Sequence, residues 1–144
     1  MAKRPLKRTR NKSGVVQSQG TGLGTQKLMA FVATRDPDRA KAFYRDTLDL
    51  NLVTEDQFAL VFEVAGTMLR VTAVHEIAPA KYTVLGWHVS DIVGVAKRLQ
   101  HRGVSFEHYP GMQQDEIGVW NSPSGAKVAW FKDPDGNTLS ITQF

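Results

Sequence analysis

The sequence repeats one order of predicted elements, and this repeat restricts the fold more than any other feature. Residues 28–34 alternate as in a β-strand, and they are followed by Asp36, a favourable helix N-cap, with Pro37 at the first helical position. Asp91 stands at the same place after a second strand-like segment, residues 82–89, so the two caps are 91 − 36 = 55 residues apart. We therefore expect two copies of one module.

Each expected helix is followed by several short strand-like segments with turn residues between them. In the first copy these are residues 51–55, 58–64 and 67–74, and in the second they are 104–108, 117–121, 126–132 and 138–142. The sequence therefore predicts an α+β fold of two βαβββ modules, residues 28–76 and 82–144. We expect curved mixed sheets around a cleft, with the helices on the outer face.

Alternation along the strands predicts which side chains face the cleft. Leu69 and Val71 point away from Arg70 and Thr72, and we expect the apolar pair to pack under the helices. In the last strand, the hydroxyl residues at 138, 140 and 142 alternate in the same way with the apolar residues at 139 and 141. The side chains expected to line the cleft and contact a ligand are Met29, Phe31, Arg70, Thr72, Val84, His88, Ser140 and Thr142.

The net charge of +4 is divided unevenly along the chain. The first 27 residues contain seven lysines and arginines and no acid, which leaves 18 − 7 = 11 bases against 14 acids in residues 28–144. A basic segment of this kind is able to contact nucleic acid, but this one has no aromatic residue, and residues 15–26 are rich in Gly, Ser and Gln. We expect residues 1–27 to form a flexible tail, residues 28–144 to form one domain, and nucleic acid not to be the partner.

Several classes of protein are disfavoured by what the sequence lacks. It has no cysteine, so it has no thiol nucleophile and no thiolate metal site. No apolar run reaches the roughly 18 residues of a membrane span, and the N-terminus has no apolar segment of a secretory signal. We expect a cytoplasmic protein that has no membrane partner.

Two stretches carry a family resemblance: residues 36–44, DPDRAKAFY, and the turn at residues 131–137, FKDPDGN. Together with the repeat, they make residues 28–144 similar to the vicinal oxygen chelate superfamily, which includes glyoxalase I, fosfomycin and bleomycin resistance proteins, extradiol dioxygenases and methylmalonyl-CoA epimerase. The resemblance implies a glyoxalase-like domain. In the metal-dependent members, His, Glu or Gln side chains from the first and last strands of the modules hold a divalent cation.

The positions that this resemblance assigns to the metal ligands hold other residues. They are Met29 and Val84 in the two opening strands, and Arg70 and Ser140 in the closing strands. A thioether, an alkyl group, a guanidinium and a hydroxyl are poor ligands for such an ion, and a shift of one residue in any strand brings in only Leu, Ala, Val, Thr or Ile. We predict a cleft that has no metal and no other cofactor.

Arg70 and His88 are the candidate catalytic residues. Arg70 is a permanent cation able to hold a carboxylate, phosphate or enolate oxygen, unless it forms a salt bridge with an acid such as Glu63 or Asp115. His88 has an imidazole that is able to transfer a proton, but a histidine at a strand end is often a surface group. Ser140 has no recognisable partner for a nucleophilic role.

Other side chains have weaker claims to function. Residues 109–116, YPGMQQDE, form the longest irregular stretch and would suit a lid over the cleft, with Asp115 or Glu116 as a base. Trp87 is expected on the helix side, whereas alternation does not place the other two tryptophans, which offer flat contact to an aromatic ligand or belong to the core. The remaining histidines are expected at the surface.

Two functions remain open from the sequence. The first is a metal-independent glyoxalase- or bleomycin-resistance-like protein that binds a small anionic or aromatic molecule in the cleft. The alternative is a lyase or isomerase of the same superfamily, in which Arg70 stabilises an oxyanion and His88 or a loop acid transfers a proton. A dioxygenase or true glyoxalase I is not expected. The resemblance also implies a homodimer.

Overall fold

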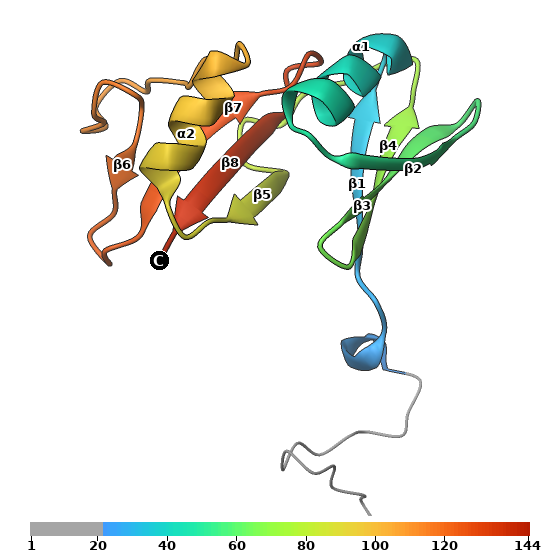
Figure 1. Ribbon diagram of the computed structural model, residues 1–144, viewed down its shortest axis with the longest axis horizontal. Helices are drawn as coiled ribbons and strands as arrows, with labels where there is room; N and C mark the ends of the chain where they lie inside the picture. The colour runs from blue at the N-terminus through green and yellow to red at the C-terminus, as the bar shows by residue number, and fades with distance from the viewer. Residues whose placement is uncertain (1–21) are drawn as a thin grey trace, which may run out of the picture.

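The computed structural model describes residues 22–144, and its first module is a four-stranded mixed sheet covered by one helix (Figure 1). A short 3₁₀ turn, η1 (Leu23–Thr25), precedes the module. The sheet order is β1-β4-β3-β2, with β1 and β4 parallel and the other pairs antiparallel. The elements are β1 (Met29–Thr34), α1 (Pro37–Lys41), the π-helix η2 (Ala42–Thr47), β2 (Asn51–Glu55), β3 (Ala59–Val64) and β4 (Thr67–Ala73).

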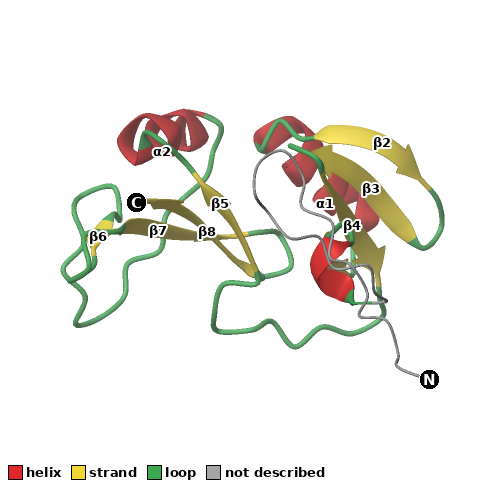
Figure 2. Cartoon of the chain, turned by 90° about the horizontal axis from the view of Figure 1, so that it is seen from below, coloured by secondary structure: helices red, strands yellow, loops and turns green. Residues whose placement is uncertain are grey.

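The second module repeats this arrangement, and Figures 1 and 2 show the two modules side by side. Its sheet order is β5-β8-β7-β6, again with the first pair parallel. The predicted α+β fold of two βαβββ modules is therefore confirmed. The elements are β5 (Leu85–His88), α2 (Ile92–His101), β6 (Trp120–Asn121), β7 (Lys127–Lys132) and β8 (Thr138–Gln143).

Both expected helix caps are present. The Asp36 carboxylate accepts a hydrogen bond from the backbone N–H of Arg39 at 3.2 Å, and Asp91 accepts one from that of Gly94 at 3.1 Å. These bonds satisfy backbone donors that have no partner inside the helix, which is why the caps mark the two helix starts.

The strand predicted at residues 104–108 is wrong. Only an isolated bridge joins Phe106 to Phe131, and the strand predicted at 117–121 is reduced to the two residues of β6. Side chains replace the sheet ladder in this region: Gln114 bonds to the backbone of Tyr109, Glu107 and Gly118. The Asp115 carboxylate accepts three further backbone N–H bonds, so the loop is held without strand pairing.

One hydrophobic core runs through both modules. Phe131 of β7 is 1% exposed and lies 6.5 Å from Phe43 of the first module, centroid to centroid. The Phe131 ring also stacks with Trp87 of β5 at 6.4 Å, which confirms the expected helix-side position of Trp87. The fully buried Tyr44 packs between Phe43 and Phe62.

A polar connection between the modules is formed by the turn at residues 133–137. Asp133 is buried and accepts a hydrogen bond from the Tyr44 hydroxyl at 2.7 Å. The Asn137 side-chain amide donates to the same carboxylate and to the backbone carbonyl of Ala33, at 2.8 and 2.9 Å. The backbone N–H of Arg35 adds a bond to Asp135. The turn that contributes to the family resemblance thus ties the second module to β1 and η2.

The predicted tail lies largely outside the described residues, because the structure describes none of residues 1–21. Residues 22–29, which include η1, are exposed. None of the helices within residues 22–144 is both long and apolar enough to cross a membrane.

Removing the Tyr44 hydroxyl is expected to change the stability of the protein at alkaline pH. Burial, and then the neighbouring Asp133 carboxylate, raise the pKa of Tyr44 far above its ordinary value of 10.0. Above pH 10 the unfolded chain therefore loses a proton that the folded chain keeps, and the free energy of unfolding falls by up to about 1.4 kcal/mol per pH unit. Tyr44→Phe removes this contribution, so denaturant titrations should show a shallower decline above pH 10 than in the wild type. Parallel declines would contradict this prediction.

Candidate functional site

Arg70 lies at the centre of the sheet face that points away from α1. Its strand, β4, runs between β1 and β3, and Arg70 pairs with Phe31 on one side and Val61 on the other. Phe31 is 61% exposed, and the neighbouring pair Met29 and Met68 are each 42% exposed, whereas Arg70 is half-buried. The face therefore presents a cation among exposed apolar side chains.

The salt bridges considered for Arg70 do not form within residues 22–144. Glu63 instead accepts a hydrogen bond from the backbone N–H of Gly66 at 2.6 Å, and Asp115 is occupied by its loop. The Arg70 charge acts on Asp56, whose pKa is lowered mainly by the backbone N–H groups of Phe58 and Ala59 and slightly further by the guanidinium. Arg70 thus keeps its hydrogen-bond donors free of carboxylates in the described part of the chain.

The other predicted site residues divide between the two modules. Thr72 lies beside Arg70 on β4, while in the second module Gly86 pairs with Ser140 and His88 pairs with Thr142. The His88 ring packs edge-on against Phe144 at 5.2 Å, and both residues are exposed. Val84, just before β5, is 39% exposed. The sheet register therefore groups Phe31 and Thr72 with Arg70, and His88 and Thr142 with Ser140.

The hydroxyl residues of β8 are less open than the sequence suggested. Thr138 is 3% exposed, and its hydroxyl donates to the backbone carbonyl of Ala80 in the linker between the modules, at 3.1 Å. Ser140 is 5% exposed, and a Cβ placed on Gly86 would lie 3.0 Å from its Oγ. Alternation gives no information about the linker that covers part of this face.

An aromatic group lies on the same face as Ser140, where the sequence left its position open. Trp130 pairs with Ser140 across β7 and β8, its ring lies 6.0 Å from that of Trp120, and the Tyr109 ring meets it edge-on at 5.6 Å. Burial, and then the charge of Glu107, raise the pKa of Tyr109. The signal that would have placed Trp130 is the β7–β8 register, because residues opposite each other across two strands share a face.

The residues at the family's metal positions do not fit a divalent ion. Met29, Val84 and Arg70 offer no oxygen or imidazole donor, and Ser140 offers one buried hydroxyl. Across residues 22–144, no three His, Asp or Glu side chains come together as a metal-binding group.

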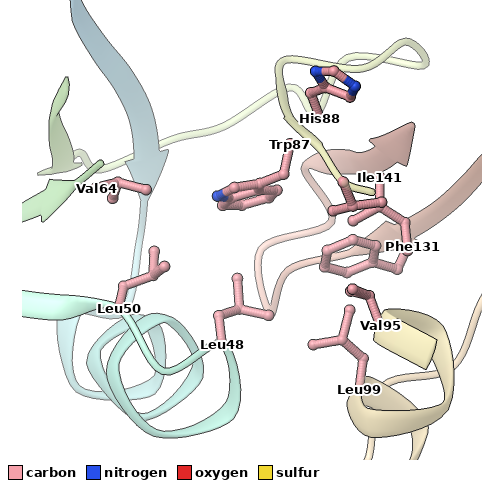
Figure 3. A pocket seen from close by; sticks show the side chains of 10 residues that line it. Leu48, Leu50, Val64, Trp87, His88, Val95, Leu99, Phe131 and Ile141 are labelled. Atoms are coloured by element: carbon pink, nitrogen blue, oxygen red, sulfur yellow. The ribbon is translucent and has the colours of Figure 1, made fainter. Parts of the chain in front are cut away.

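A cavity of about 270 Å³ lies elsewhere, between the modules on the side of the helices (Figure 3). Of the eight predicted ligand residues, only His88 lines it, and Figure 3 shows the His88 ring pointing away from its centre. Trp87 points into it, between Val64 and Leu50 of the first module and Phe131 of the second. Sequence periodicity places such side chains on the helix side but does not show that a space remains between them.

The two βαβββ modules have the same strand order, so the chain has the fold of α+β proteins built from paired modules. The family model described as Glyoxalase/Bleomycin resistance protein/Dioxygenase superfamily matches residues 28–141. The chain belongs to this superfamily. A comparison with curated proteins gave no significant match.

Solved structures with different activities have similar folds. Lactoylglutathione lyase from Agrobacterium tumefaciens is 19% identical, with a TM-score of 0.64 over 83% of this chain and 93% of that one. The oxidase ChaP-H2 is 23% identical, with a TM-score of 0.63 over 84% and 94%. A superfamily member from Sphaerobacter thermophilus is 25% identical, with a TM-score of 0.63 over 83% and 98%. At this level of identity the lyase and the oxidase establish the fold and leave the activity open.

Proposed function

We propose that this protein binds a small anionic molecule with a flat apolar part, without a metal ion, on the face that carries Arg70. The observation that supports this most directly is a half-buried guanidinium that forms no salt bridge with a described carboxylate and lies among the exposed side chains of Phe31, Met29 and Met68. A guanidinium binds carboxylate or phosphate oxygens through paired N–H donors, and the apolar neighbours would cover the rest of the ligand.

The side chains at the family's metal positions support metal-independent binding. A guanidinium at a metal position repels a cation, and the thioether and alkyl groups offer nothing to offset that repulsion. In this proposal the arginine takes over the electrostatic role that a Lewis-acidic ion would have toward an anionic ligand.

The alternative, a lyase or isomerase, has weaker support from the geometry. Arg70 and His88 lie on different sheets, and the His88 ring packs against Phe144. Asp115, the loop acid considered as a base, accepts three backbone N–H bonds through a single oxygen. A general base has to reach the proton that it removes, and the sheet register does not bring His88 beside Arg70. The homodimer and the cytoplasmic location expected from the sequence stay predictions.

Arg70→Ala is expected to weaken the binding of an aromatic carboxylate by tenfold or more, because a charge-assisted hydrogen bond contributes about 1.5–3 kcal/mol. Calorimetric titration with 2-naphthoate, an aromatic carboxylate, measures this loss. A thermal-shift screen of carboxylates and phosphates precedes it and shows whether this class of ligand binds. Arg39→Ala, which removes an exposed arginine on α1, is the matched control and should leave the affinity unchanged. Equal affinities in the wild type and Arg70→Ala would remove Arg70 from the proposal.

A further inference from the structure

The cavity between the modules has walls from both of them and is almost entirely apolar. The first module contributes side chains that follow η2 and end β3, and the second contributes β5, one side of α2, and the inner side chains of β7 and β8 (Figure 3). The apolar side chains that line it are Leu48, Leu50, Val64, Trp87, Val89, Val95, Leu99, Phe131 and Ile141.

A second hollow of about 260 Å³ continues from this cavity along α2. The two share Leu48, Val95 and Leu99 as common walls, and the second adds Arg98 and Arg102. Residues three, four and seven positions apart lie on one side of a helix, so α2 presents Val95, Arg98 and Leu99 to the first module. Arg102, the C-cap of α2, continues the same side. The groove is therefore apolar at one end and cationic at the other.

The charges at the cationic end leave an excess of one positive charge. Arg98 and Arg102 face a single acid in the lining, Asp49. Arg102 donates one bond to the backbone carbonyl of Asp46 at 3.3 Å, and the Asp46 carboxylate is paired with Arg45. Neither arginine of the groove forms a salt bridge with a carboxylate of residues 22–144.

We propose that this groove is a second ligand site, distinct from the Arg70 face, and that it binds an amphipathic monoanion such as a medium-chain carboxylate. The aliphatic part would fill the cavity under Trp87, and the carboxylate would bind Arg98 and Arg102. The combined volume of the two hollows falls within the range of about 300–1,000 Å³ that is usual for small-molecule pockets. The groove lies on the helix side of the sheets, whereas Arg70 points away from α1, so one site does not require the other.

Quenching of tryptophan fluorescence by ω-bromoundecanoate tests the site, because bromine quenches an indole only at close contact. We expect saturable quenching in the wild type that is lost in Trp87→Phe, although Trp120 and Trp130 remain. Arg98→Ala and the methyl ester of the acid should each weaken the apparent affinity by about tenfold, which corresponds to 1.4 kcal/mol. Lys97→Ala, which changes an exposed residue of α2 outside the groove, should have no effect.

Three outcomes would overturn the proposal. They are the absence of saturable quenching, quenching that Trp87→Phe leaves intact, and equal affinities for the acid with Arg98 present or replaced. Arg70→Ala separates this site from the one proposed above: it should leave the quenching unchanged, and a loss in that variant would place the acid on the other face. Circular dichroism of each variant confirms that the fold is retained.

Discussion

Asp133→Ala is expected to lower the free energy of unfolding by about 2–4 kcal/mol, a large effect for one substitution. The carboxylate is buried and accepts four hydrogen bonds, two from the backbone of its own turn, one from the Asn137 side chain and one from the Tyr44 hydroxyl. Alanine would leave the buried hydroxyl without an acceptor, and an unsatisfied buried polar group costs more than its hydrogen bond contributes.

Urea denaturation at neutral pH measures this loss. Glu76→Ala removes an exposed acid just before the linker and should change the free energy of unfolding by less than about 0.5 kcal/mol. Asp133→Asn, which keeps one side-chain oxygen, should fall between alanine and the wild type. A loss below about 1 kcal/mol in Asp133→Ala would show that the turn does not stabilise the module interface as its contacts suggest.

Local signals in the sequence predicted most of the fold. Asp36 and Asp91 mark both helix starts because a cap depends only on residues within one turn of it. Strand alternation predicted that Trp87 and Arg70 lie on opposite faces of their sheets. The strands expected at residues 104–108 and 117–121 failed or shortened where side chains bond to the backbone. Gln114 donates to the carbonyl of Glu107, and Asp115 accepts from the N–H groups of residues 117–119. Side-chain bonding of this kind leaves no periodic pattern.

The candidate site was less predictable, because it depends on contacts between distant segments. The turn at residues 133–137 contributes to the family resemblance, but local sequence gives no sign of its bond to Tyr44, which spans 89 positions. The hydrogen bond from Thr138 to Ala80 of the linker spans 58 positions, and the linker covers a residue that alternation grouped with the cleft. Residues assigned to one face by alternation are therefore candidates only, until the segments packed against that face are known.

We also expect the protein to have very low affinity for divalent metal ions, which is the second prediction of a large effect. Two unit charges 4 Å apart interact by about 4 kcal/mol at an effective dielectric of 20. A divalent ion carries two charges, so its repulsion by the Arg70 guanidinium at that distance would be about 8 kcal/mol. No carboxylate or imidazole at Met29, Val84 or Ser140 offsets this repulsion. We expect the protein to bind Zn²⁺, Ni²⁺ or Mn²⁺ only weakly, through single surface histidines, and to lose the ion on desalting.

The metal content of the purified protein tests this account most directly. The protein is incubated with each ion, desalted and measured by inductively coupled plasma mass spectrometry, with a sample treated with chelator beside it. We predict far less than one ion per chain and identical melting temperatures with and without the chelator. One divalent ion per chain that survives desalting, and whose removal lowers the melting temperature, would contradict the proposal that Arg70 has replaced the metal.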